Sequence, residues 1–296
     1  MKTPPVIDYE GSDYQEKFWN QGGRAYEDAA EDIALRRLLP SGSGHMLELG
    51  AGAGRNTHRY RGYDRITLLD YSTTQLKQAL EHLGSNDKYR FISADVYRLP
   101  FVPGTFNAAT MIRTIHHLAE PAIAFDQINQ VLVNGSPFIL EFANKRNIKS
   151  ILRYWLKKQD WDPFSPEQVE FVKLNFDFHP KTVKHMMAEA DFNIEDQVAV
   201  SYLRAGFFKN FIPLSILRGL EHILQRTLSR AALSPSIFLR SVVRNAVEPA
   251  AESQFFRCPA CGHYPLADTP PLITCPECGR EFPVKNGIYD FRVDPE

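Results

Sequence analysis

A glycine-rich turn after a short apolar run is the first part of this sequence whose residue types could do chemistry. The run 45–49 leads into Gly50, Gly52 and Gly54. Glycine has no Cβ atom, so it lets a ligand approach the backbone and adopts the positive φ angles of a tight turn. Asp70 ends the next apolar run, roughly where nucleotide-binding folds place a carboxylate on a ribose hydroxyl. The pattern predicts a nucleoside-cofactor site.

Two residues beside this turn argue against a dinucleotide. Arg55 holds the place of the third glycine of the G-x-G-x-x-G fingerprint, whose absent side chain permits close helix–strand packing. Glu48 stands two residues before Gly50, and a carboxylate there suits a cationic or amino-bearing ligand better than a pyrophosphate. A nicotinamide-dependent oxidoreductase is therefore disfavoured.

Three motifs in order resemble the class I S-adenosylmethionine-dependent methyltransferases. They lie within residues 40–145 and are Glu48-Leu-Gly-Ala-Gly-Ala-Gly54, Asp70, and Ser93-Ala-Asp-Val-Tyr-Arg-Leu-Pro-Phe101. The resemblance implies an α/β, Rossmann-like fold with a doubly wound, mostly parallel sheet of seven strands. It also implies S-adenosylmethionine as the cofactor.

The resemblance assigns a role to individual residues. Asp70 would accept hydrogen bonds from the ribose hydroxyls, with Tyr71 against the adenine. Asp95 would accept from the adenine amine, and the Val96 N–H would face a ring nitrogen. The predicted cofactor-binding residues are Glu48, Gly50, Ala51, Gly52, Gly54, Asp70, Tyr71, Asp95, Val96, Arg113 and Arg24.

Residues 1–40 are predicted to form an N-terminal helical lid over the cofactor. Arg24 is a candidate partner for the cofactor carboxylate, because a guanidinium fork fits a carboxylate. Arg55 is a rival for the same role. The alternative is a surface arginine on a loosely packed lid.

His116 and His117 are the candidate general bases, in Thr114-Ile-His-His-Leu118 after the fourth strand. A base is needed only if the acceptor must lose a proton during methyl transfer, and histidine titrates in the right range. Orienting the cofactor or capping the next helix is the alternative. Similar enzymes that methylate planar amines carry an Asn/Asp-Pro-Pro-Tyr-type motif at this position. That motif is absent here, which favours other acceptors.

The four cysteines form two Cys-x-x-Cys-Gly pairs separated by thirteen residues. Four thiolates satisfy a tetrahedral zinc ion and leave no open position for a catalytic water. The predicted metal ligands of this structural zinc ribbon are Cys258, Cys261, Cys275 and Cys278. Disulfide pairing is the alternative, and it is disfavoured in a protein without a signal peptide. The tail 281–292 resembles the end of small zinc-ribbon proteins that activate methyltransferases.

Hydrophobic periodicity predicts strands alternating with helices, as in a parallel sheet with helices on both faces. The predicted strands are 45–49, 66–70, 89–94, 106–112, 137–142, 194–202 and 236–243. The resemblance implies that the last two form an antiparallel edge hairpin. The predicted helices are 26–39, one from the capping box 72–75 to Gly84, one from 121 to about 134, and 180–190. The predicted domains are the lid (1–40), the methyltransferase domain (41–250) and the ribbon (251–296).

Two insertions interrupt the methyltransferase domain. The first, 147–177, carries Tyr154, Trp155, Trp161 and Phe164, which would either line the acceptor site or pack on the body of the protein. The second, 203–233, is rich in apolar and basic residues with Glu221 as its single acid. It would be a membrane-surface or RNA-binding segment, or a helical cap with a solvated basic face.

Composition points to an ordinary globular protein, with 296 residues, 44% hydrophobic residues and a net charge of −1. The amino terminus lacks the apolar run of a signal peptide and no long uncharged apolar segment is present, so a cytoplasmic location is expected.

The predicted function is methyl transfer from S-adenosylmethionine to a small-molecule acceptor. One alternative is an RNA methyltransferase whose ribbon and basic insertion dock the substrate. An alternative of another class is a non-catalytic binding or scaffold module on an inherited cofactor fold. The intact set of carboxylates and glycines favours an enzyme over a scaffold.

Overall fold

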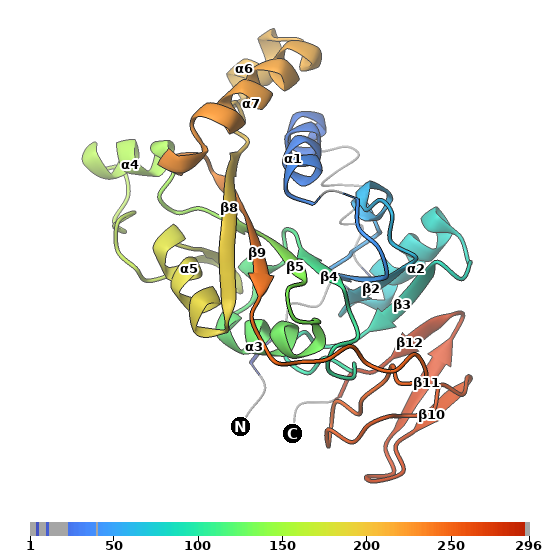
Figure 1. Cartoon of the computed structure of the whole chain (residues 1–296). Helices are drawn as coiled ribbons and strands as arrows, with labels where there is room; N and C mark the ends of the chain where they lie inside the picture. Colours follow the sequence, from blue (N-terminus) through green and yellow to red (C-terminus); the bar gives the residue numbers. More distant parts are fainter. Residues whose placement is uncertain (1–3, 6–9, 12–22, 40, 294–296) are drawn as a thin grey trace.

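One wide sheet with helices on both faces forms the centre of the computed structural model (Figure 1). The structure describes residues 4–5, 10–11, 23–39 and 41–293. The predicted lid therefore lies largely outside the described residues, except for its helix α1 (Ala25–Leu38).

The seven predicted strands are present, and they stand next to one another in the order β3-β2-β1-β4-β5-β9-β8. The first five in the chain pair in parallel, and β9 runs antiparallel to both β5 and β8, as predicted. Their bounds are β1 His45–Leu49, β2 Arg65–Asp70, β3 Tyr89–Ser93, β4 Ala108–Met111, β5 Pro137–Ala143, β8 Phe192–Val200 and β9 Ser236–Val243.

Strand β4 is shorter than the predicted 106–112. Phe106 forms only an isolated bridge with Leu132. At the other end, Arg113 has a left-handed φ of 55°, which turns the chain out of the sheet directly after Ile112.

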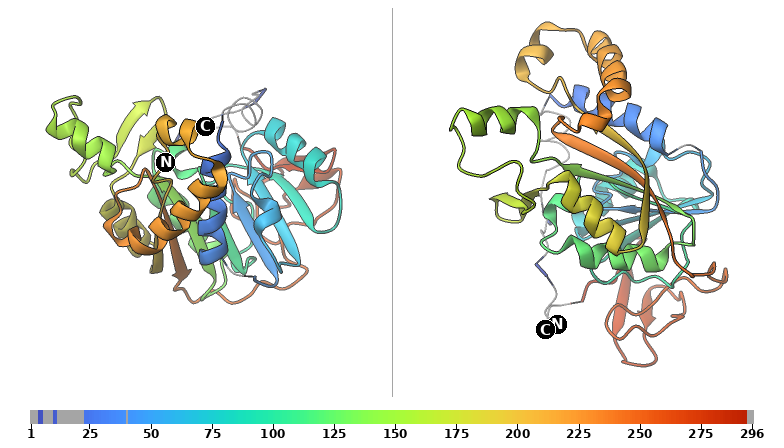
Figure 2. Two further views of the ribbon diagram at one scale, coloured as in Figure 1. Left: turned by 90° about the horizontal axis from the view of Figure 1, so that it is seen from above. Right: turned by 60° about the vertical axis from the view of Figure 1, so that its left-hand side comes forward.

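Three further strands extend the sheet beyond the seven that were predicted. They are β10 Leu272–Thr274, β11 Glu281–Lys285 and β12 Ile288–Asp290, all from the cysteine-rich segment. Strand β12 pairs in parallel with β3, with Tyr289 opposite Ile92, so the sheet has ten strands among the described residues. The ribbon is visible at the sheet edge in Figure 2.

The ribbon shares the hydrophobic core of the main sheet. Phe256 is fully buried, pairs with Phe101 in an isolated bridge, and lies 4.7 Å from Phe291 between ring centroids. The Arg90 guanidinium lies 4.4 Å from the centroid of the Phe255 ring, so a cation–π contact adds to the packing between the ribbon and the main sheet. The described residues of the ribbon and of the main sheet thus belong to one hydrophobic cluster.

Helices cover both faces of the sheet. Apolar residues of α1 and α2 pack on one face, and those of α3 and α5 pack on the other. The N-cap of the predicted capping box at α2 is confirmed, since the Gln75 N–H donates to Ser72 Oγ at 3.3 Å, whereas the Ser72 N–H donates to Asp70 rather than to the Gln75 side chain. The helices after α1 are α2 Thr73–Leu83, α3 Pro121–Val131, α4 Ile148–Trp155, α5 Pro180–Glu189, α6 Gly206–Phe211 and α7 Leu214–Thr227, with 3-10 turns η2 Thr57–Arg59, η3 Ile115–His117 and η4 Ser229–Ala231.

The two insertions project from the body of the protein at the end of the molecule where α1 lies (Figures 1 and 2). The first contains α4 and a small hairpin of β6 (Val169–Val172) and β7 (Asn175–Asp177). The second contains α6 and α7. Within the described part of the chain, no helix has the length and apolarity needed to cross a membrane.

The shared core predicts that the ribbon contributes to the stability of the whole protein. Replacing Phe256 by alanine should lower the free energy of unfolding by about 3–5 kcal/mol, because it leaves a cavity between ribbon and sheet. Urea unfolding measures this change. The Phe164→Ala variant, with a side chain that is 43% exposed, is the control and should change it by less than about 1 kcal/mol. Equal effects of the two substitutions would contradict a shared core.

Candidate cofactor site and metal centre

The glycine turn after β1 has the backbone conformation that the sequence predicts. Gly50, Gly52 and Gly54 have φ angles of 66°, 54° and 75°. A Cβ atom on Gly50 would stand 2.0 Å from Thr114 Oγ1, and one on Gly54 would stand 2.9 Å from Leu83. The turn therefore excludes side chains both by conformation and by space.

Asp70 joins the glycine turn to the start of α2. Its carboxylate accepts hydrogen bonds from the N–H groups of Gly52 at 2.8 Å and Ser72 at 2.9 Å. The carboxyl end of β2 is thereby held beside the turn, at the position predicted for ribose recognition. Each carboxylate oxygen can accept more than one hydrogen bond.

Glu48 is a buried carboxylate beneath the turn. Thr57 Oγ1 donates to it at 2.6 Å and Tyr60 Oη donates at 3.2 Å. Burial raises the pKa of Glu48 to about 7, and the two hydroxyl donors only partly offset this effect. A cationic group bound beside it would favour the ionised form.

Helix α1 presents carboxylates to the arginines around the turn. Glu31 is buried and accepts from Arg55 at 2.6 Å and from Arg113 at 2.5 Å. Asp28 also pairs with Arg55. Arg24, predicted to bind the cofactor carboxylate, pairs with Glu27 at 3.2 Å. The structure thus gives all three predicted or rival arginines a carboxylate partner on α1, and their roles toward a cofactor stay predictions.

The residues predicted for adenine lie at the next strand ends. Asp95 Oδ1 accepts from the Tyr97 N–H at 2.9 Å, and burial raises the pKa of this carboxyl. Val96 beside it is buried. The Arg292 guanidinium, from the end of the ribbon, lies 5.7 Å from the centroid of the Tyr71 ring. The ribbon therefore contacts this edge of the site, which the sequence analysis did not foresee.

The two histidines lie on the 3-10 turn η3, with ring centroids 3.9 Å apart. His117 Nδ1 is 3.2 Å from the Leu174 carbonyl oxygen, a contact that requires a proton on Nδ1. Burial lowers the pKa of both rings, so both are neutral near pH 7. Neither caps α3, which begins after Glu120 without a side-chain cap. The role of a base stays a prediction.

Sequence reasoning missed a second group of ionisable residues near the end of β5. Glu141 accepts from Ser236 Oγ and from the Arg113 N–H, at 2.5 and 2.8 Å. Burial raises the pKa of Asp177 to about 6, against the opposing effect of Arg204. A lone glutamate within the apolar strand 137–143 was the available signal for this group, since acids are rarely placed there without a partner.

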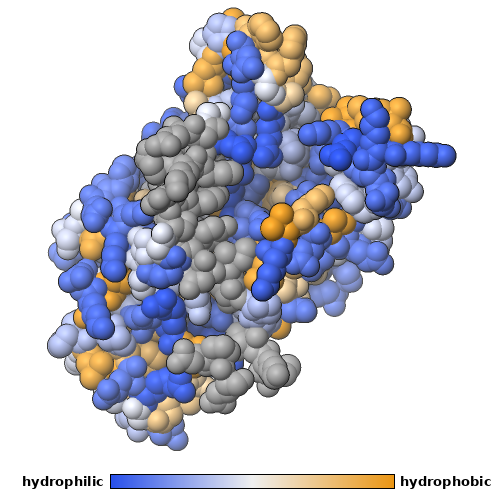
Figure 3. All heavy atoms as spheres, turned by 180° about the vertical axis from the view of Figure 1, so that it is seen from behind, coloured by the Kyte–Doolittle hydropathy of each residue, from blue (hydrophilic) through white to orange (hydrophobic). Residues whose placement is uncertain are grey.

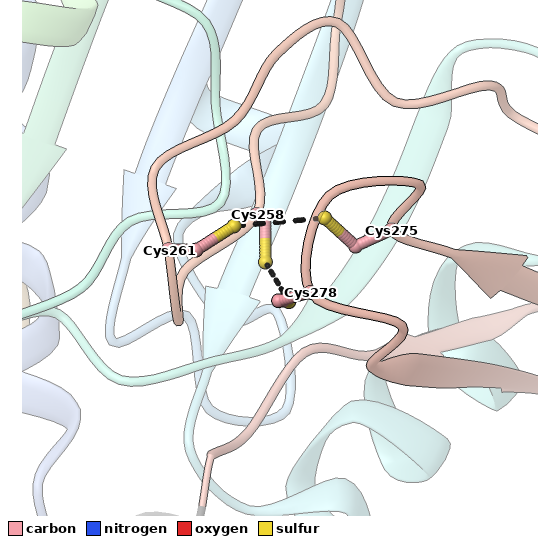
Figure 4. A group of neighbouring side chains, drawn as sticks. All are labelled: Cys258, Cys261, Cys275 and Cys278. Carbon is pink, nitrogen blue, oxygen red and sulfur yellow. Dashed lines mark hydrogen bonds between the residues drawn. The ribbon is translucent and has the colours of Figure 1, made fainter.

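The four cysteines converge on one point, as Figure 4 shows. Cys258 and Cys278 have sulfurs 3.7 Å apart, and those of Cys261 and Cys275 are 3.6 Å apart. Sulfurs about 2.3 Å from a tetrahedral zinc ion stand about 3.8 Å from one another, so the spacing fits that ion. No pair is bonded as a disulfide. This cluster is compatible with a small zinc-binding element.

The turns around the sulfurs also suit metal ligation. Gly262 and Gly279 have φ angles of 81° and 69°, and their N–H groups donate to the Cys258 and Cys275 carbonyls at 2.9 Å each. Backbone N–H groups point at the Cys258 and Cys275 sulfurs, as predicted.

The buried position of Glu48 predicts a pH-dependent stability. Its folded pKa lies above the value of an unfolded glutamate, so the protein should lose stability as the pH rises from about 4.5 to about 7. The Glu48→Gln variant cannot ionise and should not show this loss. From pH 5 to 7.5, its free energy of unfolding should gain about 2 kcal/mol relative to that of the parent protein. Urea unfolding of both proteins at the two pH values measures the difference in their free energies of unfolding. A difference that does not change with pH would contradict the raised pKa of Glu48.

Comparison with known proteins supports the interpretation of this site. Residues 47–140 match the family described as a methyltransferase domain. An O-methyltransferase of Penicillium expansum is 32% identical over 109 residues, which cover 35% of this chain and 40% of that protein. A demethylmenaquinone methyltransferase of Clavibacter sepedonicus is 26% identical over 110 residues, covering 36% and 45%. The chain thus spans less than half the length of these curated relatives.

Solved structures share the fold at low sequence identity. A putative S-adenosylmethionine-dependent methyltransferase of Listeria monocytogenes aligns with a TM-score of 0.53 at 13% identity, over 74% of this chain and 99% of that chain. A complex of the Haloferax volcanii Trm112 methyltransferase activator and a putative methyltransferase aligns with a TM-score of 0.52 at 16% identity, over 76% and 95%. The chain has the Rossmann-like fold of these methyltransferases, and its residues 47–140 match the methyltransferase-domain family.

Proposed function

We propose that this protein transfers a methyl group from S-adenosylmethionine to an apolar small-molecule acceptor. The observation that carries the proposal is the arrangement of three carboxylates around the side-chain-free turn. Glu48 lies in β1, Asp70 ends β2, and Asp95 follows β3, so the three lie at the same edge of the parallel sheet. Ligands of open α/β sheets bind at this edge.

The residues present suit the chemistry of that cofactor. S-adenosylmethionine, when bound, supplies a methyl group on a positively charged sulfur. Asp70 and Asp95 accept hydrogen bonds from ribose hydroxyls and the adenine amine, and Glu48 provides negative charge beneath the amino-acid part. Helix α1 is held beside the turn by the ion pairs of Glu31 with Arg55 and Arg113. In this proposal it would exclude water from the reacting atoms.

An apolar acceptor agrees with the names of some of the relatives. The relatives include proteins named for methylation in quinone biosynthesis, in addition to O-methyltransferases. Asp177 and His117 are the candidate proton acceptors for a hydroxyl-bearing substrate, because burial keeps the pKa of the first near 6 and the second neutral. Exposed apolar side chains on the insertions also favour such an acceptor over RNA.

We also propose that the cysteine cluster holds a structural zinc ion. All four sulfurs would be ligands, which leaves no position for a reacting water. The ion would stabilise the ribbon, whose last strand β12 completes the sheet beside β3.

The cofactor assignment is tested by calorimetric titration with S-adenosylhomocysteine. The Asp70→Ala and Asp95→Ala variants should each weaken binding at least tenfold, since a hydrogen bond to a charged group contributes about 1.5–3 kcal/mol. The Asp87→Ala variant, which alters an exposed carboxylate on the loop before β3, is the control and should bind like the parent protein.

A folded parent protein that gives no heat with this compound would refute the assignment. Where binding is present, transfer of tritium from labelled S-adenosylmethionine to fractionated small molecules distinguishes an enzyme from a binding module. Thermal unfolding of each variant is measured in parallel, because Asp70 also holds the glycine turn.

The metal assignment predicts one zinc ion per chain by mass spectrometry of the purified protein. The Cys278→Ser variant should lose most of this zinc and lower Tm by several degrees, because the ribbon core adjoins the main core. Cys278 is exposed, so this substitution leaves no cavity. The control Lys285→Gln, on the exposed side of β11, should retain zinc and Tm. Full stability without metal would contradict a structural role.

A further inference from the structure

Helix α7 buries two polar side chains beside the single leucine Leu217 and leaves several other apolar side chains exposed. Glu221 and Gln225 are fully or almost fully buried. Ile216, Leu220 and Ile223 lie one helical turn apart on another face and are 53%, 41% and 57% exposed. This distribution is the reverse of the usual surface helix, which buries its apolar face.

Hydrogen bonds join the buried polar face of α7 to α1 and to the residues that follow β8, while Gln225 Oε1 is buried without a hydrogen-bond partner among the described residues. Glu221 accepts from the Ser201 N–H at 2.7 Å and from Gln225 Nε2 at 3.0 Å, and Tyr26 Oη also donates to it. Gln225 Nε2 further donates to the Ala30 carbonyl at 2.9 Å. These bonds fix the rotation of α7 and therefore hold its apolar face outward.

Helix α6 and the first insertion carry further exposed apolar side chains. Phe207 and Phe211 of α6 are 69% and 74% exposed, with ring centroids 5.1 Å apart. Helix α4 exposes Trp155 to 67%, and Val172 at the hairpin tip is 66% exposed. The alternative in which the insertion packs its aromatic rings on the body is therefore wrong for Trp155.

All charged side chains exposed on α4, α6 and α7 are cationic. The only acid of 203–233 is Glu221, which is buried, and 144–158 contains none. In Figure 3, apolar patches lie at the top and upper right, where α6–α7 and α4 are found when Figure 1 is turned round, with hydrophilic side chains beside them. The exposed cations are Lys149, Arg153, Lys157, Lys158, Arg218, Arg226 and Arg230.

We propose that α4, α6 and α7 together form a docking face for an anionic membrane surface. Aromatic and aliphatic side chains would enter the headgroup–acyl boundary, while arginine and lysine would pair with lipid phosphates. A second copy of this chain fits less well, because a two-fold contact would bring like charges together around the apolar residues. The proposal goes beyond methyl transfer and does not depend on it.

Co-sedimentation with vesicles tests this face without any cofactor. The full chain should bind vesicles of phosphatidylglycerol and phosphatidylcholine and should bind pure phosphatidylcholine at least tenfold more weakly. The triple variant Ile216→Ser, Leu220→Ser and Ile223→Ser should lose at least tenfold in partitioning, without loss of Tm because these side chains are exposed. The control Ile123→Ser alters a 39% exposed apolar residue on α3 and should bind unchanged.

Two further measurements distinguish an anionic membrane surface from a second copy of this chain as the partner of this face. The Arg218→Gln, Arg226→Gln double variant should lose the preference for anionic over neutral vesicles. Its binding should still depend on the exposed apolar side chains. Tryptophan emission should shift to the blue on vesicle addition, and Trp155→Phe should remove most of this shift while keeping binding. Equal sedimentation of parent and triple variant would overturn the proposal. The proposal would also be overturned if the parent protein were a dimer in sedimentation equilibrium, the triple variant were a monomer, and neither protein bound vesicles.

Discussion

The pairing of Glu31 with Arg55 and Arg113 is the interaction on which the site depends. A buried carboxylate between two guanidinium groups joins three elements: α1, the glycine turn and the end of β4. Burial alone would raise the pKa of Glu31, but the two arginines outweigh it and lower the pKa below its usual value. A buried carboxylate that lost both arginines would be left unpaired, which is strongly destabilising.

This arrangement links the predicted cofactor residues to the acids near the end of β5. Arg113 contacts Glu31 through its side chain and Glu141 through its backbone N–H. Its left-handed conformation is what allows the two contacts to be made in opposite directions. The predicted cofactor residues and the unpredicted acids at β5 are thus parts of one network of charges.

Local patterns in the sequence were sufficient for the sheet and for the cofactor edge. The glycines, Asp70 and the Ser72 cap act through neighbours close in the chain, so their positions could be predicted. Pairings between distant segments could not be predicted from the sequence. The contact of Glu31 with Arg113, the addition of β12 to β3, and the contact of Arg292 with Tyr71 leave no periodic signal. The orientation of α7 escaped prediction because periodicity locates an apolar face but not its partner.

The pairing of β12 with β3 has a consequence for synthesis of the chain. Strand β3 is made long before β12, the strand that covers its outer edge. Until then the nascent protein carries a sheet with an open edge, and open edges recruit other chains. Premature termination shortly before residue 288 would thus leave the outer edge of β3 uncovered and able to pair with other chains.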